Sequence, residues 1–179
     1  MRMLIVYGST YGDTADAADR IATRVETLSG VEPVLREVGR TDLSDLESYD
    51  VILVGCSTWN EGEIQDDWFD KLPELDSLDL GGKRVALFGS GDQLGYPITF
   101  QDALGIIAEK LEARGAQLVG LWPTDGYEFD ASLALRGDEF VGLALDYTCQ
   151  IELNEDRIER WTAQLVEELG LVPALPAAL

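Results

Sequence analysis

Short apolar runs recur along the chain and alternate with segments of helical period. Four of the runs are rich in β-branched residues and almost continuously apolar, which is typical of parallel strands buried on both faces. They are residues 3–8 (MLIVYG), 51–56 (VILVGC), 85–90 (VALFGS) and 117–122 (QLVGLW). A weaker run at residues 32–38 (EPVLREV) alternates between apolar and polar positions, and we expect an edge strand there.

Three segments carry apolar residues at helical spacing and predict helices. The first covers residues 13–28 and the second residues 100–114, which Gly115 follows as a typical stop. The third lies near the end, before Gly170 and Pro173. The apolar stripes consist of Ala18, Ile21, Ala22 and Val25 in the first helix, Leu104, Ile107, Ala108 and Leu111 in the second, and Ile158, Trp161, Leu165 and Leu169 in the third.

Strands that alternate with helices predict an α/β fold with a doubly wound parallel sheet. One segment breaks the alternation: residues 123–139 are aromatic and acidic without a helical period, and another apolar run, residues 140–145 (FVGLAL), follows. We interpret this segment as an insertion that interrupts the last strand, which resumes near Phe140. The length of 179 residues fits one domain, which we place at residues 1–170, with a short Pro-broken tail at residues 171–179.

The loop after the first apolar run holds many hydrogen-bonding groups and no cation. Its hydroxyls belong to Ser9, Thr10, Tyr11 and Thr14. The loop leaves the carboxyl end of the first predicted strand, and ligands bind beyond these strand ends in open α/β sheets. A helix N-terminus behind such a loop binds anions. The patterns G-x-x-x-x-G-K-[ST] and G-x-G-x-x-G are missing, which favours a monophosphate held by neutral donors. The alternative is that these hydroxyls only cap the helix and its turn.

Two more loops, residues 57–63 and 90–99, also leave strand ends, and each carries an aromatic residue. Taken singly, Trp59 and Tyr96 are more typical of the edge of a core than of a cofactor site. Two rings from adjacent strand ends can, however, sandwich a planar ring system. Together with the hydroxyl loop, they predict a flat ligand that carries a phosphate.

The composition excludes several kinds of catalytic and metal site. The sequence contains no His, which rules out Ser-His-Asp and Cys-His nucleophile systems and His-ligated metals. Its two cysteines, Cys56 and Cys149, form no disulfide framework and cannot hold a four-thiolate cluster, so redox chemistry would need an organic cofactor. There is no apolar run of membrane-spanning length and no basic-then-apolar leader, and we expect a cytoplasmic protein.

The charge is extreme, with 34 acidic against 13 basic residues and a net charge of -21. Such a surface repels nucleic acid and anionic membranes and steers the molecule toward basic partners. Solubility or a high-salt habitat explains the acidity equally well.

Three stretches of the sequence resemble the flavodoxins, small proteins that carry electrons on one FMN. They are residues 57–68 (STWNEGEIQDDW), residues 89–106 (GSGDQLGYPITFQDALGI) and residues 123–146, which begin PTDGYEF and correspond to the extra loop of the long-chain subgroup. The resemblance covers essentially the whole chain. It implies a five-stranded parallel sheet of order 2-1-3-4-5, with the insertion interrupting the last strand.

The resemblance also implies which residues bind FMN. The phosphate loop comprises Ser9, Thr10, Tyr11, Gly12, Asp13 and Thr14; the inner loop Ser57, Thr58, Trp59, Asn60, Glu61 and Gly62; and the outer loop Ser90, Gly91, Asp92, Gln93, Tyr96 and Thr99. Tyr96 is implied to be the outer stacking ring, and Asp146 lies where the family has an Asp near the ribityl-phosphate region. The Asn60–Glu61 peptide is implied to accept a hydrogen bond from the central ring nitrogen.

Three residues depart from the family pattern. Tyr11 replaces a small hydroxyl residue, and its phenol must point away from the phosphate or cover it. Asp13 should face solvent, because it would otherwise lie beside a phosphate dianion. Glu61 adds charge at a position that is often apolar.

The resemblance implies a low-potential one-electron carrier rather than an enzyme. We expect a monomer without metal, nucleic-acid or membrane partners, which shuttles electrons between a flavodoxin reductase and an acceptor, both with basic surfaces. One alternative is an FMN-dependent quinone reductase on the same fold, although no nicotinamide fingerprint or substrate-binding His or Tyr constellation supports it. A signalling receiver domain would need clustered Asp after the first strand, where this chain has hydroxyls.

Overall fold

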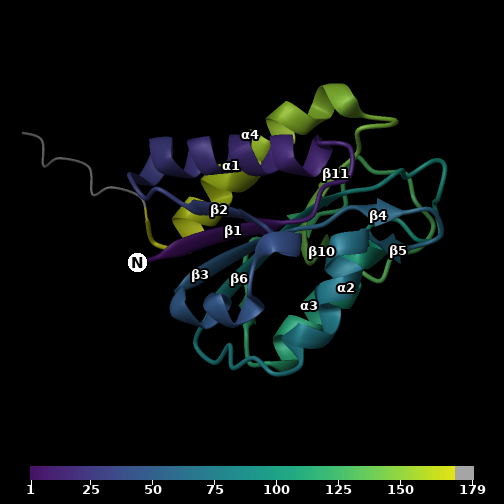
Figure 1. Ribbon diagram of the computed structural model, residues 1–179. Coiled ribbons are helices and arrows are strands. Elements are labelled where there is room, and N and C mark those ends of the chain that lie inside the picture. The colour runs from purple at the N-terminus through teal and green to yellow at the C-terminus, as the bar shows by residue number, and fades with distance from the viewer. Residues whose placement is uncertain (172–179) are drawn as a thin grey trace, which may run out of the picture.

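A parallel sheet lies between two pairs of helices in the computed structural model, which describes residues 1–171 (Figure 1). The strand order is β2–β1–β3–β6–β11, and β7 also pairs with β6. All neighbouring strands of this sheet are parallel. The strands are β1 (Met3–Tyr7), β2 (Val34–Glu37), β3 (Val51–Gly55), β6 (Arg84–Ser90), β7 (Gln117–Leu118) and β11 (Gly142–Leu145). The expected sheet order and the expected edge strand are confirmed.

The last position of the sheet is filled by two short strands instead of one. β7 pairs with Arg84 and Val85 at the start of β6, and β11 pairs with the other half of β6, residues 87–90. The insertion between β7 and β11 therefore interrupts the fifth strand, as the sequence predicted.

The prediction of one strand over residues 117–122 is wrong, because pairing with β6 ends at Leu118. Gly120 adopts a left-handed backbone with φ of 70°. Its carbonyl accepts a hydrogen bond from Trp161 Nε1 (2.7 Å), and its N–H donates to Glu168 Oε2 (2.8 Å). Both partners belong to helix α4 (Asn154–Glu168). The chain leaves the sheet here because α4 binds the backbone groups of Gly120.

The insertion forms a small antiparallel sheet of its own and packs on the main sheet through aromatic rings. It consists of β8 (Trp122–Pro123), β9 (Leu135–Arg136) and β10 (Glu139–Phe140). The Tyr127 hydroxyl donates to the Ala144 carbonyl of β11 (2.6 Å) and accepts from Trp122 Nε1 (2.8 Å). Phe100 and Phe140 pack against the Tyr127 ring, and Phe129 packs against both of these phenylalanines. These contacts fix the insertion next to the last strand.

Helices α1 (Asp13–Ser29) and α4 cover one face of the sheet, and α2 (Asp66–Leu75) and α3 (Asp102–Ala113) cover the other (Figure 1). Three of the four were predicted, but α2 was not. Its N-cap is Gln65, which is not a usual capping residue, although Gln65 Oε1 accepts from the Trp68 N–H (3.2 Å). Pro73 also lies inside the helix, where a proline argues against a helical prediction. The acidic first turn was the available signal for this helix.

The remaining elements are short. They are the antiparallel pair β4 (Thr58–Trp59) and β5 (Glu63–Ile64), and the 3-10 helices η1 (Val38–Arg40), η2 (Leu43–Ser48) and η3 (Ile151–Leu153). Leu171 follows α4, and its N–H donates to the Val166 carbonyl (2.9 Å), whereas residues 172–179 of the expected tail lie outside the described residues. Within the described residues, no helix has the length and apolar character needed to span a membrane.

Candidate functional site

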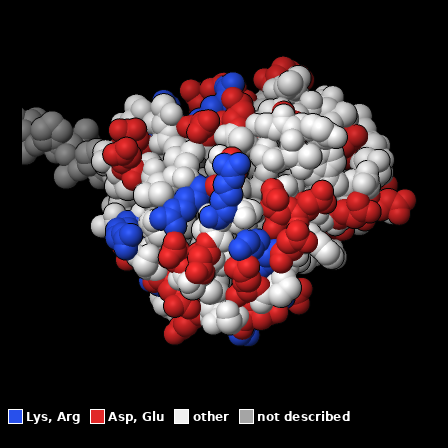
Figure 2. All heavy atoms as spheres, in the orientation of Figure 1, with Lys and Arg blue, Asp and Glu red and all other residues white. Residues whose placement is uncertain are grey.

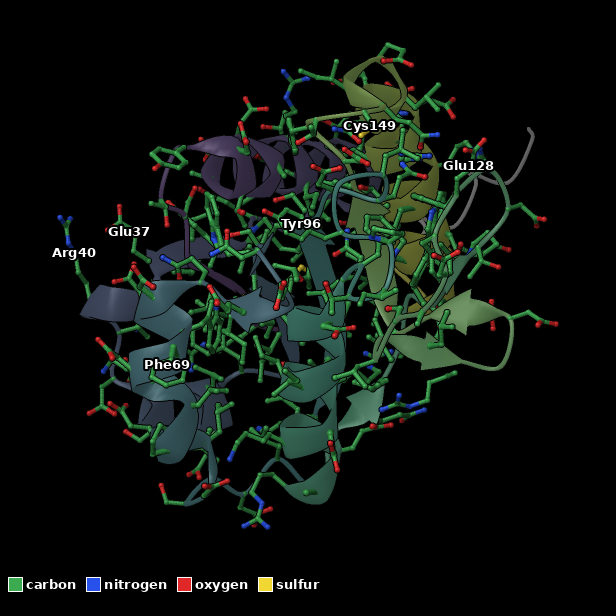
Figure 3. All side chains as sticks on the ribbon, turned by 90° about the vertical axis from the view of Figure 1, so that its right-hand side faces the viewer. Glu37, Arg40, Phe69, Tyr96, Glu128 and Cys149 are labelled. Atoms are coloured by element: carbon green, nitrogen blue, oxygen red, sulfur yellow. The ribbon has the colours of Figure 1, made fainter. Side chains whose placement is uncertain are left out.

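A cavity of about 250 Å³ opens at the carboxyl edge of the sheet, the edge that faces the viewer in Figure 3. The three loops predicted from the sequence meet here, and the loop after β11 joins them. Among the described residues that line it, none is Lys or Arg. The lining residues are Ser9, Tyr11, Asp13, Thr14, Ser57, Thr58, Trp59, Asn60, Ser90, Gly91, Asp92, Tyr96, Tyr147 and Thr148.

The hydroxyls of the first loop do not cap helix α1. Ser9 Oγ accepts from the Gly12 N–H (3.1 Å), which closes the loop, and Gly12 adopts a left-handed φ of 103°. In the described chain, α1 begins without a hydrogen bond from a capping side chain. Its first-turn N–H groups therefore remain free for an anion. Thr14 is only 3% exposed and lines the cavity. Asp13 is exposed and lines the cavity as well.

The second loop is a tight turn between β4 and β5. The Gly62 N–H donates to the Trp59 carbonyl (3.0 Å), and Asn60 has a positive φ of 41°, a conformation that Asn tolerates. Asn60 Nδ2 donates to Glu63 Oε2 (2.7 Å), which holds the turn. Glu61 is exposed at the turn. Asn60 therefore lies in the left-handed region of the backbone, at the tip of this turn.

Helix α3 supports this turn from behind. Thr58 Oγ1 accepts from the Ala103 N–H (3.1 Å) at the start of α3. A Cβ atom on Gly62 would lie 3.0 Å from Asp102 Oδ2 and 3.3 Å from Thr99 Cβ. Burial raises the pKa of Asp102, and the Leu133 N–H that donates to this carboxyl opposes the shift. The short distance to Thr99 shows that Gly62 packs against this residue. Neither Gly62 nor Thr99 lines the cavity.

The third loop is shaped by Asp92. Its Oδ1 accepts from the Gly95 N–H (2.7 Å), and its carbonyl accepts from the Tyr96 N–H (3.0 Å). The turn presents Tyr96 to the cavity with 39% of its surface exposed. Gln93 points inward instead, and its Oε1 accepts from the Glu128 N–H of the insertion (2.6 Å).

Asp146 joins the third loop to the loop after β11 and does not line the cavity. It is fully buried, and its Oδ2 accepts from the N–H (3.2 Å) and Nε2 (2.8 Å) of Gln93. Its Oδ1 accepts from the N–H groups of Thr148 (2.9 Å) and Cys149 (2.8 Å). The ligand atoms of Asp92, Asp146 and Cys149 lie within 4.8 Å of one another, but these donors already occupy the Asp146 oxygens.

The sequence therefore named twelve of the cavity-lining residues and missed two, Tyr147 and Thr148. Both follow the carboxyl end of β11, the signal that had located the other three loops. Six named residues lie outside this wall: Thr10, Gly12, Glu61, Gly62, Gln93 and Thr99.

Three groups near the cavity, Tyr147, Cys56 and Cys149, have raised pKa values. Burial, followed by the charges of Asp16 and Asp13, raises the pKa of Tyr147 to about 12. Burial raises the pKa of the Cys56 thiol to about 12. Burial and the hydrogen bond to Asp92 also raise the pKa of Cys149. Neither thiol is therefore activated as a nucleophile at neutral pH.

Tyr11 packs its ring edge-on against Trp59. The ring centroids are 5.4 Å apart, the planes meet at 68°, and Tyr11 is 81% exposed. The Tyr11 ring therefore packs on the indole ring of Trp59, and the two rings form one wall of the cavity.

The fold and the site define a doubly wound α/β protein with an anion loop that carries no Lys or Arg and with aromatic residues at the edge where ligands bind. The flavodoxin family model matches residues 5–161. A flavodoxin of a Nostoc species is 47% identical over 165 residues, 92% of this chain and 97% of that protein. Flavodoxin 1 of Escherichia coli is 45% identical over 175 residues, 97% of each chain.

A solved structure agrees with these relatives. The Fusobacterium nucleatum flavodoxin bound to flavin mononucleotide has a TM-score of 0.87 and 25% identity, over 94% of this chain and 99% of that one. The chain belongs to the flavodoxin family, and the lengths matched fit the long-chain type. Flavodoxins are electron-transfer proteins and not enzymes, which confirms the interpretation of the sequence and overturns the receiver-domain alternative.

Proposed function

We propose that this flavodoxin carries electrons singly on one non-covalently bound FMN. The observation that carries the proposal is the cavity at the carboxyl edge, where a hydroxyl loop without a cation lies beside two aromatic residues, Trp59 and Tyr96. The Fusobacterium nucleatum flavodoxin of the same fold is bound to flavin mononucleotide.

The donors and rings around the cavity fit the parts of FMN. The N–H groups at the start of α1 and the hydroxyls of Ser9 and Thr14 suit a phosphate. Trp59 and Tyr96 come from different loops and offer aromatic faces to a flat ring. The pKa of Tyr147 is raised to about 12, so its phenol is neutral at pH 7 and adds no charge beside a phosphate. We propose that the six named residues outside the cavity wall support these loops.

The surroundings of the cavity favour a strong electron donor. FMN, when bound, supplies a ring that accepts and releases electrons. The chain has a net charge of -21, and the cavity-lining residues in the described chain provide no Lys or Arg, so added negative charge there is disfavoured. Aromatic walls also exclude the water that would solvate such charge. A low potential follows from these two effects.

Stepwise anaerobic reduction, followed by absorption spectroscopy, tests this function. We expect purified protein reconstituted with FMN to be reduced in two resolved one-electron steps. One unresolved two-electron step, together with turnover of a quinone by a nicotinamide reductant, would support the quinone reductase alternative. Extraction of FAD, or failure to bind any flavin, would contradict the proposal.

The Thr14→Val variant tests whether the first loop holds the phosphate. We expect FMN binding to weaken by about 1.5 kcal/mol, the lower range for a hydrogen bond to a charged group. Riboflavin binding should hardly change, because riboflavin has no phosphate. Fluorescence quenching measures both affinities, and equal losses for the two ligands would show that the loop does not bind phosphate.

We further propose redox partners with basic surfaces, a reductase and an acceptor. Figure 2 shows acidic side chains spread over the visible face and along its right-hand edge. We expect electron transfer to a basic partner to slow steeply with salt, because the Debye length falls from about 10 Å at 0.1 M to about 3 Å at 1 M. Stopped-flow rates that are constant or rise with salt would instead favour a high-salt habitat as the cause of the acidity.

We also propose that residues 1–170 act as one domain and that the protein is a cytoplasmic monomer. Cys56 and Cys149 are free thiols, which supports a reducing compartment. Sedimentation at several concentrations would reveal an oligomer if the monomer proposal is wrong.

A further inference from the structure

A second and larger cavity adjoins the first and shares one wall with it. We call it the α2 groove; its volume is about 680 Å³. The shared wall consists of Tyr11, Trp59 and Asn60, which line both cavities. The other residues of the α2 groove are Thr10, Gly62, Glu63, Ile64, Asp66, Phe69, Leu72 and Ile106.

Part of the α2 groove is lined by apolar side chains that are not fully packed into the hydrophobic core. Phe69 and Leu72 lie one turn apart on α2, and Ile106 of α3 and Ile64 of β5 complete the surface. Phe69 is 66% exposed, although it carries a large aromatic ring. Figure 3 shows Phe69 on the same side of the molecule as Tyr96. A grouped apolar surface beside a ligand cavity is typical of an interaction site.

Acidic residues surround this apolar surface. Glu63 and Asp66 line the α2 groove, and residues 61–70 contain three more acidic residues and no basic one. None of the described residues that line the groove is Lys or Arg. A second copy of this chain would bring its own net charge of -21 against this rim, which is unfavourable. The rim is complementary to a partner that presents Lys or Arg around an apolar side chain.

We propose that the α2 groove is a docking site for a redox partner protein, and that it takes an apolar side chain flanked by basic residues. This inference rests on the proposed function, since it concerns the protein that exchanges electrons with this flavodoxin. An occupant of the groove contacts the Tyr11–Trp59 wall, whose other side faces the proposed flavin cavity. Docking there places the partner next to the cofactor.

The test measures electron transfer from the FMN-loaded, reduced protein to a lysine-rich c-type cytochrome in stopped flow at low salt. Phe69→Ala should lower the second-order rate by about tenfold, as expected for an aromatic contact that carries much of the binding. Phe69→Leu should retain most of the rate. The matched control is Val34→Ala, which removes another exposed apolar side chain, at the start of β2 and away from the carboxyl edge. It should leave the rate unchanged.

A charge variant tests the acidic rim separately. Asp66→Asn should lower the rate at low salt and flatten its salt dependence, because it removes one rim charge. Fluorescence quenching should give the same FMN affinity for all variants and for the wild type.

Four outcomes would overturn this inference. Phe69→Ala and Val34→Ala could give equal rates, or Asp66→Asn could leave the salt dependence unchanged. Phe69→Ala could weaken FMN binding, which would make the groove part of the flavin site. Self-association of the wild type that Phe69→Ala abolishes in sedimentation would identify a second copy as the occupant. In each of these cases the wild type still binds FMN and transfers electrons. Loss of either property in the wild type itself would instead refute the proposed function, and this inference with it.

Discussion

Asp146→Ala should lower the free energy of unfolding by roughly 3 kcal/mol, because buried donors lose their acceptor. Two of these donors belong to Gln93, which is itself buried, and two are the N–H groups of Thr148 and Cys149. FMN affinity should fall as well, since the same bonds hold the loop that carries Tyr96. Urea unfolding of the FMN-free protein measures the first effect without any contribution from ligand binding.

Asp125→Ala is the matched control for this experiment. Asp125 is exposed and belongs to the insertion, so its loss should change stability by less than about 0.5 kcal/mol. If both variants lose the same small amount, water replaces the carboxylate and Asp146 does not join the two loops. If stability falls but FMN affinity does not, the third loop keeps its shape without these bonds.

Trp59→Ala should weaken FMN binding by about 2 kcal/mol or more, because it removes a large aromatic face next to the cavity. It also removes the ring against which Tyr11 packs. Water should then reach the flavin and solvate added negative charge, so the second one-electron step should move to higher potential. Tyr96→Ala should act in the same direction but less strongly, since Tyr96 is already 39% exposed.

Potentiometric titration and fluorescence quenching of each variant beside the wild type measure these effects. Trp59→Phe keeps a flat ring and should retain much of the affinity and both potentials. Unchanged quenching and unchanged potentials in Trp59→Ala would mean that the indole only covers the core, and that the proposed stacking is wrong.

The location of the site could be predicted because it depends on local patterns. Continuous apolar runs identify strands buried on both faces, and residues that follow such runs lie at one edge of a parallel sheet. This reasoning placed Ser9, Trp59 and Tyr96 in separate loops of one site, and they line one cavity. It missed Tyr147 only because the loop after β11 was not included.

Some features depend on contacts between segments that are distant in the sequence. The strand at residues 117–122 ends early because α4, some forty residues later, binds both backbone groups of Gly120. Gln93 was named as a ligand residue, but Asp146, 53 positions later, draws its side chain inward. Neither contact has a period or a motif that the sequence displays.

The sequence by itself determined the α/β class, the strand order through its resemblance to flavodoxins, and the hydroxyl-rich chemistry of the first loop, which has no Lys or Arg. These properties are visible because alternation, helical period and residue type are set within about ten neighbouring positions. Only the tertiary structure decided that α2 forms, that Asp146 is a buried support, and that Phe69 and Ile106 share one groove with Trp59. The physical reason is that side-chain packing and buried hydrogen bonds join segments far apart in the chain, and such pairings leave no periodic pattern in it.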